Sequence, residues 1–285
     1  MRRRPMSTFP LRVSSAVIAA AVFLTLSGCS AAPAPKLSVA LFQNRADYAT
    51  RSLQVEITNR GDTDVVITAA TFTSAYFEGS GTAGHLPYTL VAGTTTDFPG
   101  TVPPPVCQGP DTKPTARIHV TPKGGAPLVV TSTPKVPFNS LGALHAQDCG
   151  QQAFEKVASI TPAPHLRFET RDGTELALLD VTIVPTGSAG TVTLVSTTGT
   201  TLLIPTEGEV RPLGITFGAA SAPTVLTLDF VPSRCGTHVI SEDKIGTLIP
   251  FHAVAGTFED AYFRVAVSPV VKAEFYDWVG RYCGQ

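Results

Sequence analysis

The chain has few charged residues and no basic tract of the kind that binds nucleic acid. Only 15% of its 285 residues are Asp, Glu, Lys or Arg, and the formal net charge is -1. A nucleic-acid-binding face needs clustered Lys and Arg to displace counterions from phosphates, and the longest basic run here is Arg2–Arg4. The composition therefore argues against a nucleic-acid partner. Its 43% of hydrophobic residues argues equally against disorder of the whole chain.

Methionine and long apolar runs are also scarce. The two methionines are Met1 and Met6, so a chain that loses its first residues keeps no thioether for copper binding. One apolar run, residues 13–26, stands out, and it is shorter than the roughly 20 residues that cross a bilayer. We therefore expect no permanent membrane span.

The apolar run has the flanks of a secretion signal. Four arginines and no acid precede or adjoin it, and it ends at Leu26-Ser27-Gly28-Cys29. This ending resembles the bacterial lipoprotein signal. The resemblance implies that the Cys29 thiol receives a diacylglycerol and that cleavage falls after Gly28. The alternative is an ordinary secreted protein in which Cys29 is incidental.

The lipoprotein interpretation predicts the cellular location of the mature protein. Residues 1–28 would be a signal peptide and residues 29–36 a lipidated tether. Acyl chains on Cys29 would hold the protein on a membrane at its extracytoplasmic face without crossing it. Loss of the leader removes four arginines, so the mature chain is more acidic than the whole and would rely on lipid rather than charge for anchoring.

Four further cysteines, Cys107, Cys149, Cys235 and Cys283, are typical of disulfides in an oxidising compartment. Sequence alone leaves three pairings open. An internal repeat would choose among them. It would pair Cys107 with Cys149 and Cys235 with Cys283, and each bridge would contribute about 4 kcal/mol in the chain-entropy model.

Three landmarks suggest such a repeat. The alternating segment 53–57, its turn and residues 65–67 resemble segment 179–183, its turn and Val192, and both read as hairpins. A Val-Pro stretch precedes both Cys107 and Cys235. Apolar and aromatic residues precede both Cys149 and Cys283.

Strand signals dominate the mature chain. Segments such as 226–230 alternate apolar and polar residues, and turns rich in Gly, Pro, Asp and Asn recur about every ten residues. We predict an all-β fold of tandem immunoglobulin-like antiparallel β-sandwiches, each closed by a short C-terminal helical segment and one disulfide. The expected ranges are residues 37–149 for the first sandwich, 150–164 for a linker and 165–285 for the second sandwich.

Two helices are expected. Phe275, Trp278, Val279 and Tyr282 share one face of a helix over 272–282, and Trp278 is expected to cap the sandwich core rather than line a ligand site. Residues 151–159 are expected to form a second, short helix.

Two phrases carry a wider resemblance: Ile57-Thr58-Asn59-Arg60-Gly61-Asp62, and Arg234-Cys235-Gly236-Thr237-His238 followed by Glu242-Asp243-Lys244. Together with the signal, they make the chain similar to actinobacterial cell-envelope lipoproteins with immunoglobulin-like domains. That resemblance brings no activity with it.

No catalytic motif is present. The chain lacks a Gly-x-Ser-x-Gly elbow, a His-Glu-x-x-His pair and a phosphate loop, and its six histidines are scattered. Since motifs assembled in space escape this search, an enzyme is disfavoured rather than excluded. We expect no catalytic residues and no cofactor.

One segment is denser in polar groups than a turn requires. It runs from Arg234 to Lys244, and its candidate binding residues, together with a nearby histidine, are Arg234, His238, Glu242, Asp243, Lys244 and His252. A zinc site built on Cys235 and His238 conflicts with a disulfide at Cys235, so no metal site is predicted. A solvated turn whose charges signify little is the other interpretation.

Three functions follow from these observations. The leading hypothesis is a lipid-anchored, non-enzymatic envelope protein whose loops bind a partner protein or wall polymer. The second is capture of a solute or metal by the 234–244 segment and His252. The third is an envelope hydrolase.

Overall fold

The computed structural model describes residues 34–109, 112–236 and 238–284. The predicted signal peptide and the predicted lipidation site Cys29 lie outside these ranges. Within them, no helix is both long enough and apolar enough to cross a membrane.

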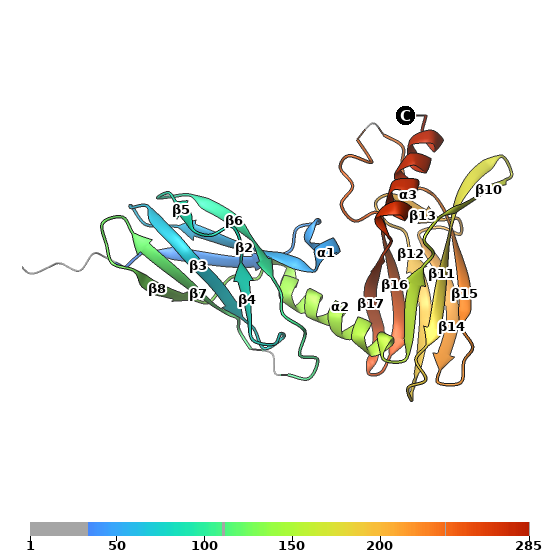
Figure 1. Ribbon diagram of the computed structural model, residues 1–285, viewed down its shortest axis with the longest axis horizontal. Helices are drawn as coiled ribbons and strands as arrows, with labels where there is room; N and C mark the ends of the chain where they lie inside the picture. The colour runs from blue at the N-terminus through green and yellow to red at the C-terminus, as the bar shows by residue number, and fades with distance from the viewer. Residues whose placement is uncertain (1–33, 110–111, 237, 285) are drawn as a thin grey trace, which may run out of the picture. The chain divides into compact units, whose positions relative to one another are not determined.

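Eight strands form the first β-sandwich, coloured blue to green in Figure 1. Its elements are β1 (Leu37–Phe42), α1 (Asp47–Thr50), β2 (Ser52–Asn59), β3 (Val65–Thr73), β4 (Ser80–Ala83), β5 (Tyr88–Leu90), β6 (Thr95–Thr101), β7 (Thr115–Pro122) and β8 (Leu128–Ser132). The strand order is β1-β2-β6-β4-β3-β7-β8, with β5 also paired to β3. Because β4 pairs with both β3 and β6, it links the two layers of the sandwich.

The second sandwich follows, in yellow to red. Its strands are β9 (Ala158–Pro162), β10 (Arg167–Arg171), β11 (Thr174–Pro185), β12 (Thr191–Thr198), β13 (Leu203–Pro205), β14 (Val210–Gly218), β15 (Thr224–Pro232), β16 (Leu248–Ala255) and β17 (Phe258–Ala266). One sheet has the order β10-β11-β15-β13 with β9 added to β11, and the other has the order β14-β12-β16-β17. All these pairings are antiparallel.

Alternating residues build both cores, as the sequence predicts. In β2, Leu53, Val55 and Ile57 are buried while the residues between them are half-buried. Side chains of successive strand residues point to opposite faces, so such a segment covers a core with one face only. The predicted all-β, tandem-sandwich fold is confirmed.

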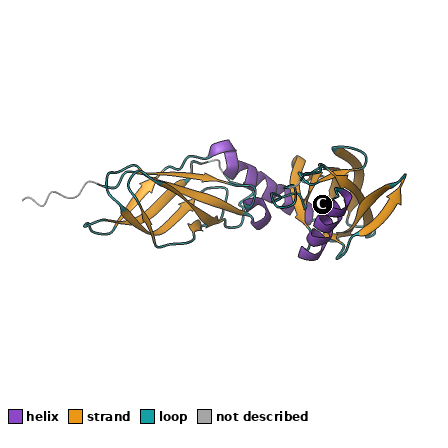
Figure 2. Ribbon diagram, turned by 90° about the horizontal axis from the view of Figure 1, so that it is seen from above, coloured by secondary structure: helices purple, strands orange, loops and turns teal. Residues whose placement is uncertain are grey.

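The helices stand out in Figure 2, which shows them against strands and loops. After a short 3-10 turn, η1 (Pro137–Asn139), helix α2 (Ser140–Glu155) contributes Leu141 and Leu144 to the core of the first sandwich. The same helix contributes Phe154 to the core of the second. One helix therefore belongs to both hydrophobic cores.

Helix α3 (Pro269–Tyr282) closes the second sandwich. The Ser268 side chain caps it by accepting a hydrogen bond from the Val271 N–H, and Pro269 occupies its first turn. Trp278 is fully buried in the core, as predicted, and its Nε1 has no hydrogen-bond partner among the described residues.

Both predicted disulfide pairings are confirmed. Cys107 is bonded to Cys149 and Cys235 to Cys283, with Cα–Cα distances of 5.5 Å and 5.3 Å. Each bridge joins the segment after one strand, β6 or β15, to the last helix of its sandwich.

The strand register supports the internal repeat. Val55 of β2 lies opposite Phe98 of β6, and Val181 of β11 lies opposite Leu226 of β15. The neighbouring partners follow in step in both pairs. The pairings β3–β5, β3–β7 and β7–β8 match β12–β14, β12–β16 and β16–β17 in the same way.

A shared irregularity strengthens this match. The β3–β7 register shifts between Ile67 and Ala69, and the β12–β16 register shifts between Leu194 and Ser196. A bulge inserts one residue and re-aims its neighbours, so bulges at equivalent positions point to a common design of the two sandwiches.

The predicted hairpins are wrong. Strand β2 pairs with β1 and β6 rather than with β3, and β11 lies in a different sheet from β12. Both turns therefore carry the chain from one layer to the other. The two segments are equivalent to each other, but neither is a hairpin.

The predicted linker at 150–164 and the short helix at 151–159 also need correction. Residues up to Glu155 complete the 16-residue helix α2, and residues from Ala158 form strand β9 against β11. Only the turn at 156–157 and residues 163–164 lie outside helix and strand in this range.

Candidate functional site

The 234–244 segment is held at both ends. Cys235 is bonded to Cys283 after α3. At the other end, the carboxylate of Asp243 accepts hydrogen bonds from the Tyr276 hydroxyl at 2.9 Å, the Gly246 N–H at 2.7 Å and the Thr201 hydroxyl at 3.2 Å. Asp243 therefore anchors the segment, and its oxygens face the protein.

Tyr276 responds to this contact. Burial raises the pKa of its hydroxyl, and the hydrogen bond to Asp243 and the negative charge of that carboxylate raise it further. The phenol stays protonated and continues to donate to Asp243.

The other predicted residues of the segment face solvent. Arg234, His238, Glu242 and Lys244 are exposed, and none of them forms an ion pair with a described residue. These four charged or titratable groups are thus available to a partner.

His252 belongs to a different group of side chains. It lies on β16, where its Nδ1 is 2.7 Å from Oδ1 of Asp260 on β17. Its ring centroid is 5.1 Å from that of Tyr262, directly opposite on β17. No contact with His238 is found among the described residues, and no group of three or more metal-binding side chains forms there.

A serine lies on the other side of His252. Ser196 of β12 is its cross-strand neighbour, so Ser196, His252 and Asp260 follow one another across three strands. Within the described residues no hydrogen bond joins Ser196 to His252, and Ser196 is buried. A serine nucleophile needs a base within hydrogen-bond reach, so the geometry supports a hydrogen-bonded His–Asp pair and not a triad.

Arg264 is the most unusual cation of this face. Its guanidinium carbon lies 4.6 Å from the Tyr48 ring centroid and 4.8 Å from that of Tyr262. Its Nη1 donates to Oε1 of Gln147 at 2.7 Å. Among the described acids, none comes within ion-pair distance of Arg264. The charge is held by rings and an amide and is not neutralised.

A hollow of about 280 Å³ opens beside Arg264. Tyr262, Pro250, Thr201 and Ile245 are among the residues that line it. Because Ile245 directly follows Lys244, the hollow adjoins the end of the predicted loop. The structure thus brings the loop's end and the neighbours of His252 to one surface, which we call the β16–β17 face.

Tyr262 and Arg264 were not among the predicted site residues. The alternation in segment 258–266 was a usable signal, since it places both on the outward face of the strand. Burial raises the pKa of Tyr262, and the positive charge of Arg264 partly opposes this.

The first sandwich provides a comparison for this face. The register equates His252 with His119, Tyr262 with Val129 and Arg264 with Thr131. Thus the second sandwich has a tyrosine and an arginine where the first has a valine and a threonine. The two copies therefore differ at two of the positions that line the hollow.

No family model matches the chain, and no curated protein matches it. Among solved structures, a biofilm associated protein B domain is 6% identical at a TM-score of 0.22, with 81% of this chain and 84% of that chain covered.

Two further structures are similar at the same level. The CsuC–CsuE chaperone and tip adhesion subunit complex of Acinetobacter baumannii is 12% identical at a TM-score of 0.18, with 82% and 99% covered. A biofilm associated protein BSP domain is 7% identical at a TM-score of 0.21, with 84% and 59% covered. Likenesses this weak carry no argument about ligand or activity.

Proposed function

We propose that the chain is a lipid-anchored, extracytoplasmic protein that binds wall polymer through its second sandwich and performs no catalysis. The observation that carries the binding role is the unneutralised Arg264 guanidinium beside the hollow of the β16–β17 face. The anchoring role rests on the lipoprotein-like ending at Cys29.

The disulfides support an extracytoplasmic location. All four cysteines that follow Cys29 are consumed in two bridges, one for each sandwich. Such bridges persist in oxidising compartments and are rare where thiols are kept reduced.

Replacing Cys29 with serine is expected to release the protein from the membrane. A serine hydroxyl cannot accept the thioether-linked diacylglycerol, so the acyl chains that hold the protein on the bilayer are lost. The measurement is membrane fractionation together with mass spectrometry of the mature N-terminus. Cys235→Ser serves as a cysteine control that should stay membrane-bound. An unlipidated wild-type Cys29 would contradict the anchoring proposal.

The chemistry of the β16–β17 face suits a polymer that carries sugar rings and anionic groups. Arg264 offers further N–H donors beyond the one used by Gln147, and a guanidinium fork fits carboxylate and phosphate oxygens. Tyr262 adds a rigid aromatic surface, and aromatic and arginine side chains dominate binding energies at interfaces. Lys244, which is exposed and directly precedes Ile245 of the hollow, adds a further positive charge.

A double variant tests the binding role. Tyr262→Val with Arg264→Thr installs the residues that the first sandwich has at these positions, so the strand pairing should persist. We expect co-sedimentation with insoluble bacterial wall polymer to weaken by at least roughly tenfold. Arg117→Thr, an exposed arginine on β7 of the first sandwich that lies opposite Thr131, is the matched control. Equal sedimentation of the double variant and wild type would contradict this role.

A further inference from the structure

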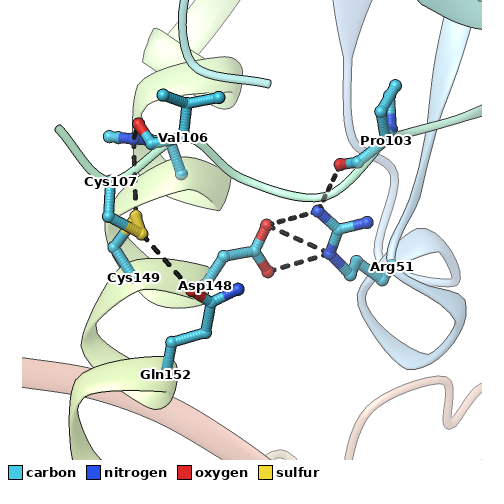
Figure 3. Close-up of a disulfide and its surroundings, with 8 residues drawn as sticks. Arg51, Pro103, Val106, Cys107, Asp148, Cys149 and Gln152 are labelled. Atoms are coloured by element: carbon cyan, nitrogen blue, oxygen red, sulfur yellow. Dashed lines mark hydrogen bonds and ion pairs between the residues drawn. A yellow bond between two sulfur atoms is a disulfide. The ribbon is translucent and has the colours of Figure 1, made fainter. Parts of the chain in front are cut away.

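The two disulfides occupy equivalent places but have different chemical surroundings. Around Cys235–Cys283, the one described polar contact of the sulfurs is a 4.0 Å approach of Cys283 Sγ to the Arg234 carbonyl. Around Cys107–Cys149, an imidazole and an amide side chain approach the sulfurs, as Figure 3 shows in part. These surroundings affect how well each sulfur is stabilised as a thiolate when the disulfide is broken.

The two sulfurs of the first bridge differ in accessibility. Cys107 is exposed in the segment after β6, and Cys149 is only 2% exposed on α2. A thiolate from solvent can therefore reach Cys107, whereas Cys149 is shielded. In thiol–disulfide exchange the sulfur that is not attacked leaves as the thiolate. Accessibility makes Cys149 the leaving sulfur.

His145, one helical turn before Cys149, is placed to receive that thiolate. Its Nε2 lies 3.0 Å from the Val106 carbonyl oxygen and 3.4 Å from Cys149 Sγ. A carbonyl oxygen only accepts hydrogen bonds, so Nε2 must carry the proton in this contact. The same nitrogen lies within hydrogen-bond reach of Cys149 Sγ, so its N–H can be shared with or passed to the sulfur. Its bond strengthens when the sulfur becomes charged.

The imidazole is held in place by aromatic neighbours. Its ring stacks on Tyr76 at a centroid distance of 4.5 Å and an interplanar angle of 21°. Phe77 meets the same ring edge-on at 6.3 Å. The imidazole nitrogen is therefore held 3.4 Å from the sulfur before any reaction begins.

An ion pair keeps the two halves of the bridge together. Arg51 donates to both carboxylate oxygens of Asp148, the residue before Cys149, at 2.7 to 3.0 Å. It also donates to the carbonyl oxygen of Pro103 at 2.7 Å, as Figure 3 shows, and to that of Val102 at 2.7 Å. The segment leading to Cys107 thus stays tied to α2 without the disulfide.

We infer that Cys107–Cys149 is a reversible exchange site for a low-molecular-weight thiol. The thiolate of the small thiol attacks Cys107 Sγ, a new S–S bond forms there, and the Cys107–Cys149 bond breaks. The electron pair goes to Cys149 Sγ, which accepts the hydrogen bond of His145. One disulfide replaces another, so no further oxidant or reductant is needed. The Arg51–Asp148 pair holds Cys149 near the adduct, which allows the reverse step.

Exchange with glutathione tests the inference, on purified chain carrying Cys29→Ser so that every remaining cysteine lies in a bridge. After acid quenching and alkylation, peptide mass spectrometry should find the glutathione adduct on Cys107 and alkylated Cys149. His145→Phe keeps the ring that stacks on Tyr76 but has no N–H, and it should slow this adduct by roughly tenfold. His145→Gln restores a donor and should recover part of the rate.

The second bridge and a distant histidine are the references. The rate at Cys235–Cys283 should be the same in all variants, and His119→Phe, an exposed ring on β7, should leave both rates unchanged. Circular dichroism and the Tm identify any variant that has lost its fold. The inference is overturned if the adduct forms on Cys149, if His145→Phe folds and reacts at the wild-type rate, or if both histidine variants slow both bridges equally.

Discussion

Replacing Phe154 with alanine is expected to lower the free energy of unfolding of the second sandwich by about 3 to 5 kcal/mol. Phe154 lies on α2 but is fully buried in the second core, with its ring 5.2 Å from that of Phe263. Removing a buried aromatic ring loses its transfer free energy and leaves a cavity. The loss of stability in the second sandwich would therefore come from a residue of α2, which precedes that sandwich in the sequence.

The single tryptophan makes this measurable. Trp278 is buried in the same core, so its fluorescence during urea unfolding follows the second sandwich. Glu155→Ala, an exposed neighbour on the same helix, is the matched control and should shift the midpoint little. An unchanged midpoint for Phe154→Ala would show that α2 does not stabilise this core.

The strands and the cysteine pairing could be predicted because both depend on local pattern. Alternation in segments such as 53–57 decides which side chains face a core, and the repeat decides which cysteines pair. Strand partners depend on more than this. The turns after β2 and β11 have hairpin composition, yet each leads to the other layer. Turn residues allow the chain to reverse direction, but they do not determine which strand the following strand pairs with.

The linker was mispredicted because proline is ambiguous. The Pro-rich stretch at 160–164 reads as a spacer, but β9 pairs on one side only, with β11. Proline is tolerated at such a position because an edge strand need not donate all its N–H groups. Pro162 ends β9 opposite Val181. A linker composition can therefore belong to an edge strand.

The sequence indicates one end of the candidate site but not the residues at its centre. Sequence density of charge found the 234–244 segment, and His252 was placed beside it. The contacts of Arg264 could not be found this way, since Tyr48 and Gln147 are remote in the sequence. Likewise Asp243 is indistinguishable from its exposed neighbours until Tyr276 is seen to bind it.

The burial of Asp229 in the second sandwich could not be predicted from the sequence either. The alternation of 226–230 predicts a wet face for it, and it does point away from Leu228 and Phe230, yet it is buried. Arg171 of β10 and Arg211 of β14 cover it, with Nη1–Oδ distances of 2.9 Å and 2.7 Å. Because β14 and β15 belong to different sheets, this ion-pair group joins the two layers.

Asp229→Ala is expected to destabilise the second sandwich by about 2 to 3 kcal/mol. Removing one member of a buried ion pair costs about 3 to 5 kcal/mol when all its members are buried. Here both arginines keep a second acid, Glu169 at 3.5 Å from Arg171 and Glu207 at 3.2 Å from Arg211. The lower value applies because Arg171 is half exposed, whereas Arg211 is largely buried. Urea unfolding followed by Trp278 fluorescence measures this loss of stability. Glu259→Ala, at an exposed acid on β17, is the control. If Asp229→Ala lowers the free energy of unfolding no more than the control does, the ion pairs of Asp229 do not stabilise the second sandwich.

The same carboxylate predicts a pH dependence. Burial alone would raise the pKa of Asp229, but hydrogen bonds from Thr206 and Arg171 and the charge of Arg211 outweigh it and lower the pKa. A folded-state pKa below the unfolded value near 3.8 gives stability that is present above that pH and lost as pH falls through the folded pKa. The hydrogen bond from Arg167 also lowers the pKa of Asp180, so this carboxylate contributes a pH dependence in the same direction. Asp229→Asn should therefore flatten the acid limb of the stability curve, and Asp180 should account for part of the slope that persists. An acid limb as steep as that of wild type would mean that the carboxylate of Asp229 is not what the two arginines stabilise.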